Sequence, residues 1–412
     1  MIQYQEFTLD NGLEVVVHEE QNTELAVVNL LYKVGSRDES PDKTGFAHLF
    51  EHLMFGGSVN VPSYDEPLQK VGADNNAYTT PDITNYYVTL PANNLETAFW
   101  LESDRMLSLS FDPKVLEVQR KVVIEEFKQR YLNQPYGDIW LKLRPLAYEK
   151  HPYNWATIGK EISHIEEATM EDVKAFFQKY YVPNNAILVV TGKVTMEQVK
   201  ELCEKWFAPI PAGKEIARNY PAEGTHKGKK TLNVTAKVPT SALYKAYHIP
   251  ARNHEDYYHL DMLSDILGRG KSSRLYETLV KKEEVFNSIS CFLTGSADPG
   301  LFVISGKLTK NVTLEEAEEK VDMLVQDFLN SELKEEELTK VKNKAESSLV
   351  FSETELLNRA TNLAYYKFLG DISLINTEVE KVKAVSASKI KELAGKFLVE
   401  ENATVLYYQA EK

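Results

Sequence analysis

Apolar and polar positions near the start of the chain alternate in the pattern that is typical of strands. The pattern predicts strands at residues 14–18 and 26–32, joined by a turn that contains Asn22. Helical and strand patterns then follow one another up to about Trp206. Such a mixture predicts an α+β fold, in which helices pack against antiparallel-rich sheets.

One combination of elements occurs twice, 217 residues apart. Residues 173–189 and residues 390–406 each show a helical pattern, a short turn with an asparagine, and an apolar strand. Because this spacing is close to half of the 412-residue chain, we infer a tandem duplication and two homologous domains. The alternative is a chance similarity between two common helix–turn–strand units.

A segment rich in proline, glycine and lysine lies between the two halves and is the best candidate for a linker. Its prolines and glycines interrupt the helical and strand patterns on either side. We therefore predict an N-terminal domain at residues 1–212, a linker at 213–230, and a homologous C-terminal domain at 231–412.

A short amphipathic pattern at residues 46–54 is the most informative in the chain. Its apolar positions recur at the spacing i, i+3, i+4, i+7 and i+8, which predicts a helix. His48, Glu51 and His52 fall together on the other face, in the order His-x-x-Glu-His. Two histidines one turn apart can bind one Zn²⁺, and the glutamate can act as general base on a water at the metal. The alternative is a solvated polar face.

A zinc hydrolase needs a third protein ligand, and the helical pattern at 113–131 offers two neighbouring glutamates. Glu125 shares a face with Lys121 and Lys128, so we expect it to form surface ion pairs. Glu126 lies on a mostly uncharged face, where a carboxylate needs a partner such as a metal ion. The helical phase therefore favours Glu126 as the third ligand, with an ordinary boundary glutamate as the alternative.

These residues resemble the signature of the inverzincin metallopeptidases, the family of pitrilysin, insulin-degrading enzyme and the mitochondrial processing peptidase. That family adds a glutamate ligand to the His-x-x-Glu-His helix, in a stretch similar to residues 119–126. The family's ligand aligns with Glu126, 74 residues after His52, and an earlier glutamate of the pattern is Gln119 here. The resemblance implies one Zn²⁺ bound by the two histidines and Glu126, with Glu51 as general base.

The resemblance covers essentially the whole chain, including residues 270–276 in the second half. It implies a zinc-dependent endopeptidase that hydrolyses peptides or unfolded polypeptides, built from two homologous α+β domains that form half of a clamshell. It also implies an edge strand within residues 76–87, on which a peptide substrate adds as a further strand. The substrate-contacting residues would be Asn76, Ala77, Tyr78 and Thr79. A polar β-hairpin without a catalytic role is the alternative.

One part of the family's site is missing from this chain. Related half-length chains carry an arginine and a tyrosine that hold the substrate, and the matching positions here are Val280 and Asn287. The resemblance therefore implies a heterodimer with a homologous chain that supplies the pair, and a homodimer is less favoured. Residues 262–268, the second-repeat counterpart of the zinc helix, contain no histidine pair, so we expect one zinc per chain.

A non-catalytic peptide-binding or scaffold subunit is the competing function. It is disfavoured because all four positions of the zinc site, the three ligands and the base, are intact. An unrelated metal hydrolase that acts on small molecules is disfavoured by the match to the substrate strand.

The composition is that of a globular protein, and it narrows the range of partners. The 47 basic and 61 acidic residues give a net charge of −14, which argues against nucleic acid as a partner. Cys203 and Cys291 lack metal-ligand spacing and indicate a reducing compartment. There is no apolar stretch of about 18 residues and no signal-peptide pattern, so we expect a cytoplasmic protein that does not contact membranes.

Overall fold

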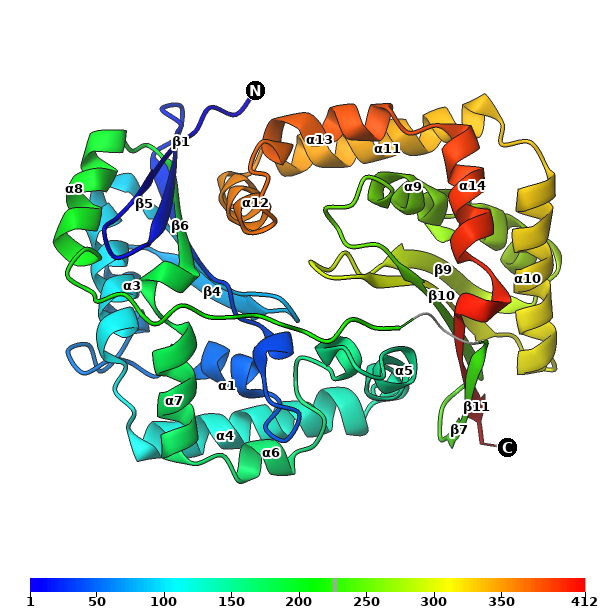
Figure 1. Cartoon of the computed structure of the whole chain (residues 1–412), viewed down its shortest axis with the longest axis horizontal. Coiled ribbons are helices and arrows are strands. Elements are labelled where there is room, and N and C mark those ends of the chain that lie inside the picture. The colour runs from blue at the N-terminus through cyan, green and yellow to red at the C-terminus, as the bar shows by residue number, and fades with distance from the viewer. Residues whose placement is uncertain (225–227, 412) are drawn as a thin grey trace. The chain divides into compact units, whose positions relative to one another are not determined.

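The computed structural model describes residues 1–224 and 228–411, which form two compact units interleaved along the sequence. Unit 1 comprises Met1–Arg130, Trp155–Tyr220 and Val350–Thr377, and unit 2 comprises Tyr131–Asn154, Pro221–Leu349 and Glu378–Lys412. Each unit contains one sheet with helices packed against it (Figure 1). The structure therefore confirms a two-domain α+β fold.

Sheet 1, in unit 1, has six strands in the order β1-β2-β6-β3-β5-β4. Their bounds are β1 Gln5–Thr8, β2 Glu14–Glu19, β6 Ala186–Gly192, β3 Leu25–Tyr32, β5 Thr84–Pro91 and β4 Asp74–Thr79. β2 and β6 run parallel, and the other neighbouring pairs are antiparallel. The two strands predicted on either side of Asn22 form as β2 and β3, but β6 lies between them. All seven residues of β6 are buried, which suits the centre of a sheet covered on both faces.

Sheet 2, in unit 2, repeats this topology with five strands in the order β7-β11-β8-β10-β9. Their bounds are β7 Lys230–Ala236, β11 Ala403–Ala410, β8 Ala242–Ile249, β10 Gly300–Leu308 and β9 Phe286–Leu293. β7 and β11 are parallel and the other pairs are antiparallel. The five strands match β2, β6, β3, β5 and β4 in order and direction, so the structure confirms two homologous domains.

The repeated sequence motif forms the same structure twice. It consists of α7 Met170–Tyr180, the 3₁₀ turn Pro183–Asn185 and β6 in unit 1, and of α14 Ala387–Phe397, the 3₁₀ turn Glu400–Asn402 and β11 in unit 2. Asn185 Nδ2 donates to the Tyr180 carbonyl at 2.8 Å, and Asn402 Nδ2 donates to the Phe397 carbonyl at 2.8 Å. The asparagine of each predicted turn therefore satisfies a carbonyl group at the end of the preceding helix.

The other helices lie around these sheets (Figure 1). In unit 1 they are α1 Phe46–Leu53, α2 Asp65–Lys70, α3 Leu95–Ser108, α4 Pro113–Phe127, α6 Ser163–Glu166, α8 Met196–Trp206 and α12 Leu356–Phe368. In unit 2 they are α5 Ile139–Ala147, α9 Tyr257–Gly268 and α10 Leu314–Asn330. α11 Glu335–Ser352 and α13 Leu374–Lys383 each contribute residues to both units. Short 3₁₀ turns occur at Ser36–Asp38, Ala92–Asn94 and Pro152–Asn154, and π-helical segments at Lys128–Leu132 and Tyr276–Lys282.

Two helices make the units differ from the predicted ranges 1–212 and 231–412. α12 comes from the second half of the sequence, but its apolar face, including Leu363, packs on sheet 1. α5 comes from the first half, yet Leu143 on its apolar face packs on sheet 2. Periodicity indicates that a helix has an apolar face but not which sheet it covers. Of the predicted linker 213–230, residues 225–227 lie outside the described residues, and Lys230 already belongs to β7.

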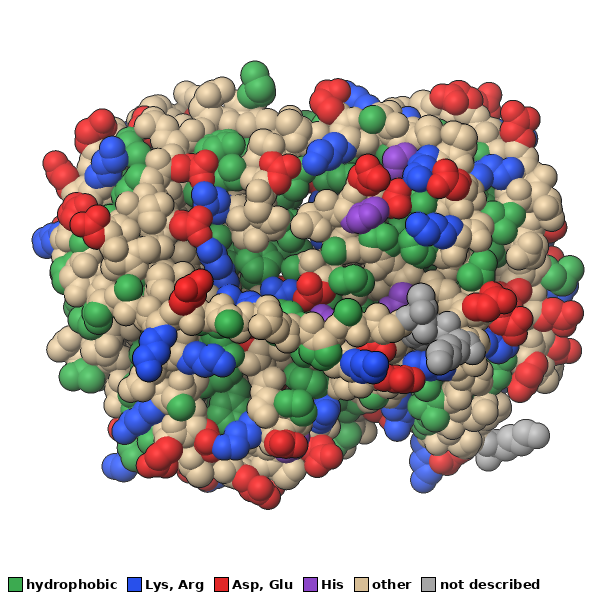
Figure 2. Space-filling model, viewed as in Figure 1, with side chains coloured by type: hydrophobic (Ala, Val, Ile, Leu, Met, Phe, Trp, Pro, Cys, Tyr) green, Lys and Arg blue, Asp and Glu red, His purple; other side chains and the backbone are tan. Residues whose placement is uncertain are grey.

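The surface carries mixed charge. Figure 2 shows acidic side chains scattered among basic ones over the face in view, in a chain whose net charge is −14. In the ranges that the structure describes, no helix combines the length and the apolar character needed to cross a membrane. The cytoplasmic location stays a prediction.

Candidate metal centre

Helix α1 carries the His-x-x-Glu-His motif, and its apolar face is buried as the sequence predicts. The residues of that face, each at most 5% exposed, are Phe46, Leu49, Phe50 and Leu53. Gly45 precedes the helix with φ at 88°, and a Cβ there would lie 2.7 Å from the carbonyl oxygen of Ile158. A side chain is therefore excluded at this position. Burial of the apolar face directs His48, Glu51 and His52 away from the core.

A buried carboxylate outside the helix caps the first turn of α1. Glu39 accepts hydrogen bonds from the amides of Gly45 at 2.9 Å and Ala47 at 2.8 Å, and from Trp155 Nε1 at 3.1 Å. Burial raises the pKa of Glu39 to about 8, although the three hydrogen bonds oppose this rise. The sequence analysis missed Glu39, which lies six residues before Gly45 and outside the spacing of any local capping motif.

Helix α4 carries the third predicted ligand. The Glu126 side chain is 18% exposed and lies on the flank of the buried face of α4. Glu125 is exposed and accepts a hydrogen bond from Gln129 Nε2 at 3.1 Å. Lys121, expected to pair with Glu125, instead lies 3.1 Å from Glu117. The two glutamates therefore differ in burial as the helical phase predicts.

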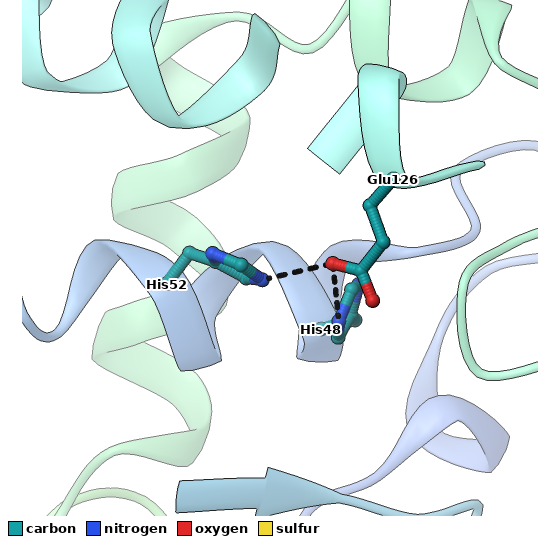
Figure 3. Close-up of side chains that lie close together, drawn as sticks. All are labelled: His48, His52 and Glu126. Atoms are coloured by element: carbon teal, nitrogen blue, oxygen red, sulfur yellow. Dashed lines mark ion pairs between the residues drawn. The ribbon is translucent and has the colours of Figure 1, made fainter. Parts of the chain in front are cut away.

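The three predicted ligands come together between α1 and α4 (Figure 3). Glu126 Oε2 lies 3.6 Å from His48 Nε2 and 3.4 Å from His52 Nε2, and the three ligand atoms are all within 4.8 Å of one another. Two zinc bonds of about 2.0–2.2 Å at a tetrahedral angle place their donor atoms roughly 3.3–3.6 Å apart. The spacing and the donor types therefore fit Zn²⁺. In the described part of the chain, this is the one group of three potential metal ligands.

The other carboxylate oxygen of Glu126 has a separate partner. Arg130 Nη1 lies 2.8 Å from Glu126 Oε1, one helical turn along the chain. Arg130 belongs to the π-helical segment Lys128–Leu132, which continues α4. The ion pair engages Oε1 and leaves Oε2 directed at the histidines. A single oxygen of Glu126 is thus presented to a metal ion.

Burial and charge favour the protonation states that bind a metal ion. Burial lowers the pKa of His48 to about 4, although the Glu126 carboxylate opposes this shift. The hydrogen bond with His52 holds the pKa of Glu126 below its usual value in spite of partial burial. A neutral imidazole and an ionised carboxylate are the forms that ligate zinc. His48 Nδ1 is buried and has no hydrogen-bond partner among the described residues, so Nε2 is the ring nitrogen that faces Glu126.

Glu51 lies on the same face of α1 but is not a member of the three-ligand group. Its Oε2 accepts a hydrogen bond from Thr79 Oγ1 at 2.6 Å. Burial raises the pKa of Glu51, and the Thr79 hydrogen bond opposes that rise. A partly buried carboxylate with a raised pKa is suited to take up a proton and return it. The predicted base and the predicted ligands are therefore brought together.

The predicted substrate strand lies at the end of sheet 1. β4 pairs with β5 alone, so its other edge is not covered by a strand of the sheet. Thr79 on β4 reaches Glu51 of α1, whereas Tyr78 packs on the opposite face of the sheet, against the cluster that includes α12. β4 is thus an edge strand next to the candidate metal centre, and its contact with a peptide stays a prediction.

The corresponding helix of unit 2 has an ion pair at the positions that match the two candidate ligand histidines. α9 packs on β9 and α14 as α1 packs on β4 and α7. At the 217-residue spacing of the repeated motif, Asp265 and Arg269 stand in the places of His48 and His52. Asp265 pairs with Arg269 at 3.0 Å and with Lys344 at 3.6 Å. Charged side chains that neutralise one another therefore replace potential metal ligands here.

The two positions at which an arginine and a tyrosine are expected in related chains both lie in unit 2. Val280 is half-buried and packs against the core of that unit. Asn287 is exposed on β9, where its Nδ2 donates to the Leu308 carbonyl at 2.6 Å. Neither side chain matches the charge or the phenol of the missing pair. The heterodimer stays a prediction.

Known proteins are similar to this chain over nearly its whole length. Residues 14–149 match the family model described as insulinase (peptidase family M16), and residues 167–345 match the one described as peptidase M16 inactive domain. The zinc protease PqqE of Helicobacter pylori is 30% identical over 410 residues, which span 98% of this chain and 92% of that protein. A probable mitochondrial-processing peptidase subunit beta of Schizosaccharomyces pombe is 27% identical over 317 residues, 72% of this chain and 67% of that one.

A solved structure agrees with these matches. The crystal structure of a protease from Helicobacter pylori has a TM-score of 0.94 at 29% identity and covers 99% of this chain and 100% of its own. The fold is thus that of a solved protease, and the chain is similar over nearly its whole length to a protein named a zinc protease. The chain belongs to the insulinase family of peptidases, family M16. The resemblance inferred from the sequence is confirmed.

Proposed function

We propose that the chain is the zinc-bearing subunit of an endopeptidase that hydrolyses peptides or unfolded polypeptides. The observation that carries the proposal is the convergence of His48, His52 and Glu126 within 4.8 Å, with Glu51 near enough to interact electrostatically with His52 and Glu126. An uncovered strand edge next to this group supports a peptide substrate. The zinc-protease names of the relatives point in the same direction.

Each residue of the centre has a separate task in this proposal. His48 and His52 would offer their Nε2 lone pairs, and Glu126 would offer Oε2, to one Zn²⁺ per chain. A bound zinc ion would supply a Lewis acid that acidifies water and polarises the scissile carbonyl. Glu51 would take a proton from the attacking water on its carboxylate and pass it to the leaving nitrogen.

The substrate would bind as an additional strand along β4, with Asn76, Ala77, Tyr78 and Thr79 in contact with it. Main-chain hydrogen bonds to a strand edge depend little on the side chains of the peptide. Such binding requires an extended chain, because a folded protein rarely offers a free strand. The proposed substrates are therefore short peptides and unfolded polypeptides.

A homologous partner chain would complete the site. Val280 and Asn287 cannot provide the guanidinium and phenol that related chains carry at these positions. We propose a heterodimer in which the second chain supplies an arginine and a tyrosine that stabilise the developing oxyanion. One relative is named as subunit beta of a processing peptidase and is therefore itself one subunit of an assembly.

The alternative is a non-catalytic peptide-binding or scaffold subunit. The match of residues 167–345 to a domain described as inactive is the observation in its favour. The metal group and Glu51, however, all lie within residues 14–149, which match the insulinase description. The chain retains both the donors for zinc and the base, so the peptidase is the better-supported function.

A combined metal and cleavage measurement tests the proposal. Zinc content of the purified chain is determined by elemental analysis, and cleavage of a quenched fluorescent peptide is followed with and without the homologous chain. We expect one zinc per chain and cleavage that the Glu51→Gln variant lacks. Zinc binding without cleavage, even with the partner present, would support the scaffold function instead.

A further inference from the structure

The open edge of β4 lies beside Glu51, and two of its backbone amides face the same way. In an antiparallel strand every second amide faces the neighbouring strand and the others face away from it. The amide of Ala77 donates to Asn76 Oδ1 at 2.8 Å and not to β5, so it faces the open edge. The amide of Thr79, two residues further on, has the same direction.

Thr79 contacts Glu51 through its side chain. Its hydroxyl donates a hydrogen bond to Glu51 Oε2 at 2.6 Å. Thr79 is the last residue of β4 and is paired in register with Thr84 of β5. The backbone that carries this hydroxyl is thus fixed by the sheet, whereas the glutamate side chain has several rotatable bonds.

One segment ties the end of β4 to the start of α1. The amides of Ser36 and Arg37 donate to the carbonyls of Thr80 at 3.2 Å and Pro81 at 3.0 Å, in the turn that follows Thr79. Glu39, two residues after Arg37, caps the first turn of α1. The strand that carries Thr79 and the helix that carries Glu51 are therefore held by the same few residues. This segment therefore holds Thr79 and Glu51 close to one another.

We propose that Thr79 is a positioning residue, whose hydroxyl holds the Glu51 carboxylate in the orientation that proton transfer requires. The proposal rests on the peptidase function proposed above and assigns a residue that acts through the base. The Thr79 hydroxyl donates to Glu51, and the proposed zinc ligands are His48, His52 and Glu126, so the hydroxyl is not needed to hold zinc. Removal of the hydroxyl should therefore affect turnover and leave the metal in place.

The test compares Thr79→Val, which keeps the branched shape without the hydroxyl, with Thr79→Ser, which keeps the hydroxyl. Thr89→Val is the matched control, the same change on β5 of the same hairpin. The zinc-loaded protein is assayed with a quenched peptide, in complex with the homologous subunit if cleavage requires it. Thr79→Val should lower kcat about ten- to hundredfold with little change in KM, and Thr79→Ser should recover most of that loss.

Two measurements distinguish a positioning role of Thr79 from a general loss of structure in the variant. Zinc content should be the same in the wild type and in all three variants. A crystal structure of zinc-free Thr79→Val should show the Glu51 carboxylate turned away from β4, and this readout requires no activity. In a Glu51→Gln background, Thr79→Val should cause no further loss, because a positioning residue acts only through the base.

Wild-type turnover in Thr79→Val, or a loss that Thr79→Ser does not restore, would overturn the proposal. Loss of zinc from Thr79→Val, or an unchanged Glu51 orientation in its structure, would do the same. If the wild-type protein cleaves no peptide, the proposed function fails. The orientation of Glu51 in the variant structure then decides the positioning role on its own.

Discussion

The Glu39 carboxylate accepts a hydrogen bond from the backbone amide of Ala47 at 2.8 Å, one residue before the first candidate zinc ligand. The start of α1 is therefore attached to an acid that is only 7% exposed. Burial raises the pKa of this acid to about 8 from the usual value of 4.5. Between these two values, the folded chain binds a proton at Glu39 more tightly than the unfolded chain does.

The stability of the chain should therefore depend on pH through Glu39. As the pH rises from about 5 to about 8, the unfolded chain releases this proton first, so the free energy of unfolding should fall relative to Glu39→Gln. The neighbouring Asp38 strengthens the effect, because its charge also raises the pKa of Glu39. Urea unfolding of the zinc-free wild type and variant across this range measures the slope. If the wild type and Glu39→Gln instead differ in free energy of unfolding by the same amount at every pH, the three N–H donors keep Glu39 ionised in the folded state.

Local periodicity selected, on each of two helices, the side chains that the structure brings together. His48 and His52 share a face because they lie four residues apart on a helix, and this relation holds wherever the helix is placed. The same reasoning separated Glu126 from Glu125, because a shift of one residue rotates a side chain by about 100° around the helix axis. The proximity of α1 and α4 followed from the family resemblance and not from either pattern.

Contacts between distant segments could not be predicted in this way. Glu39 caps α1 from outside any capping spacing, and Thr79 reaches Glu51 from a strand 28 residues further along the chain. For the same reason, the sequence did not predict that α5 packs on sheet 2 and that α12 packs on sheet 1. An apolar stripe indicates that one face of a helix is buried. It does not indicate which sheet covers that face, because several sheet faces in one chain can do so equally well.

The two adjacent glutamates of α4 should differ sharply in their effect on zinc. Glu126→Ala removes one of three protein ligands, so zinc affinity should fall by more than the roughly tenfold to hundredfold typical of a change outside the ligand set. Glu125→Ala is the control, because Glu125 is exposed and hydrogen-bonds Gln129. Titration against a competing chelator measures both affinities. The opposite pattern would place the ligand on the other face of the helix.

Glu51→Gln should separate metal binding from catalysis. The amide keeps the size of the side chain but cannot accept a proton, so peptide cleavage should fall by about two to four orders of magnitude. Zinc content should stay at the wild-type level, because Glu51 lies outside the three-ligand group. His48→Ala serves as the comparison that loses zinc as well. A Glu51→Gln variant with normal turnover, or one that loses zinc as readily as His48→Ala, would contradict the assignment of the base.

The isolated chain should bind zinc and yet cleave peptides poorly. Val280 and Asn287 stand where an oxyanion-stabilising pair is expected, and the Asn287 amide is already bonded to Leu308 within its own sheet. Addition of a homologous chain that carries the arginine and tyrosine should raise activity by about two to three orders of magnitude, the usual effect of one oxyanion donor. A partner in which both residues are changed to alanine is the control, since it should bind without activating. Full activity of the isolated chain would mean that a donor elsewhere in the same chain fills this role.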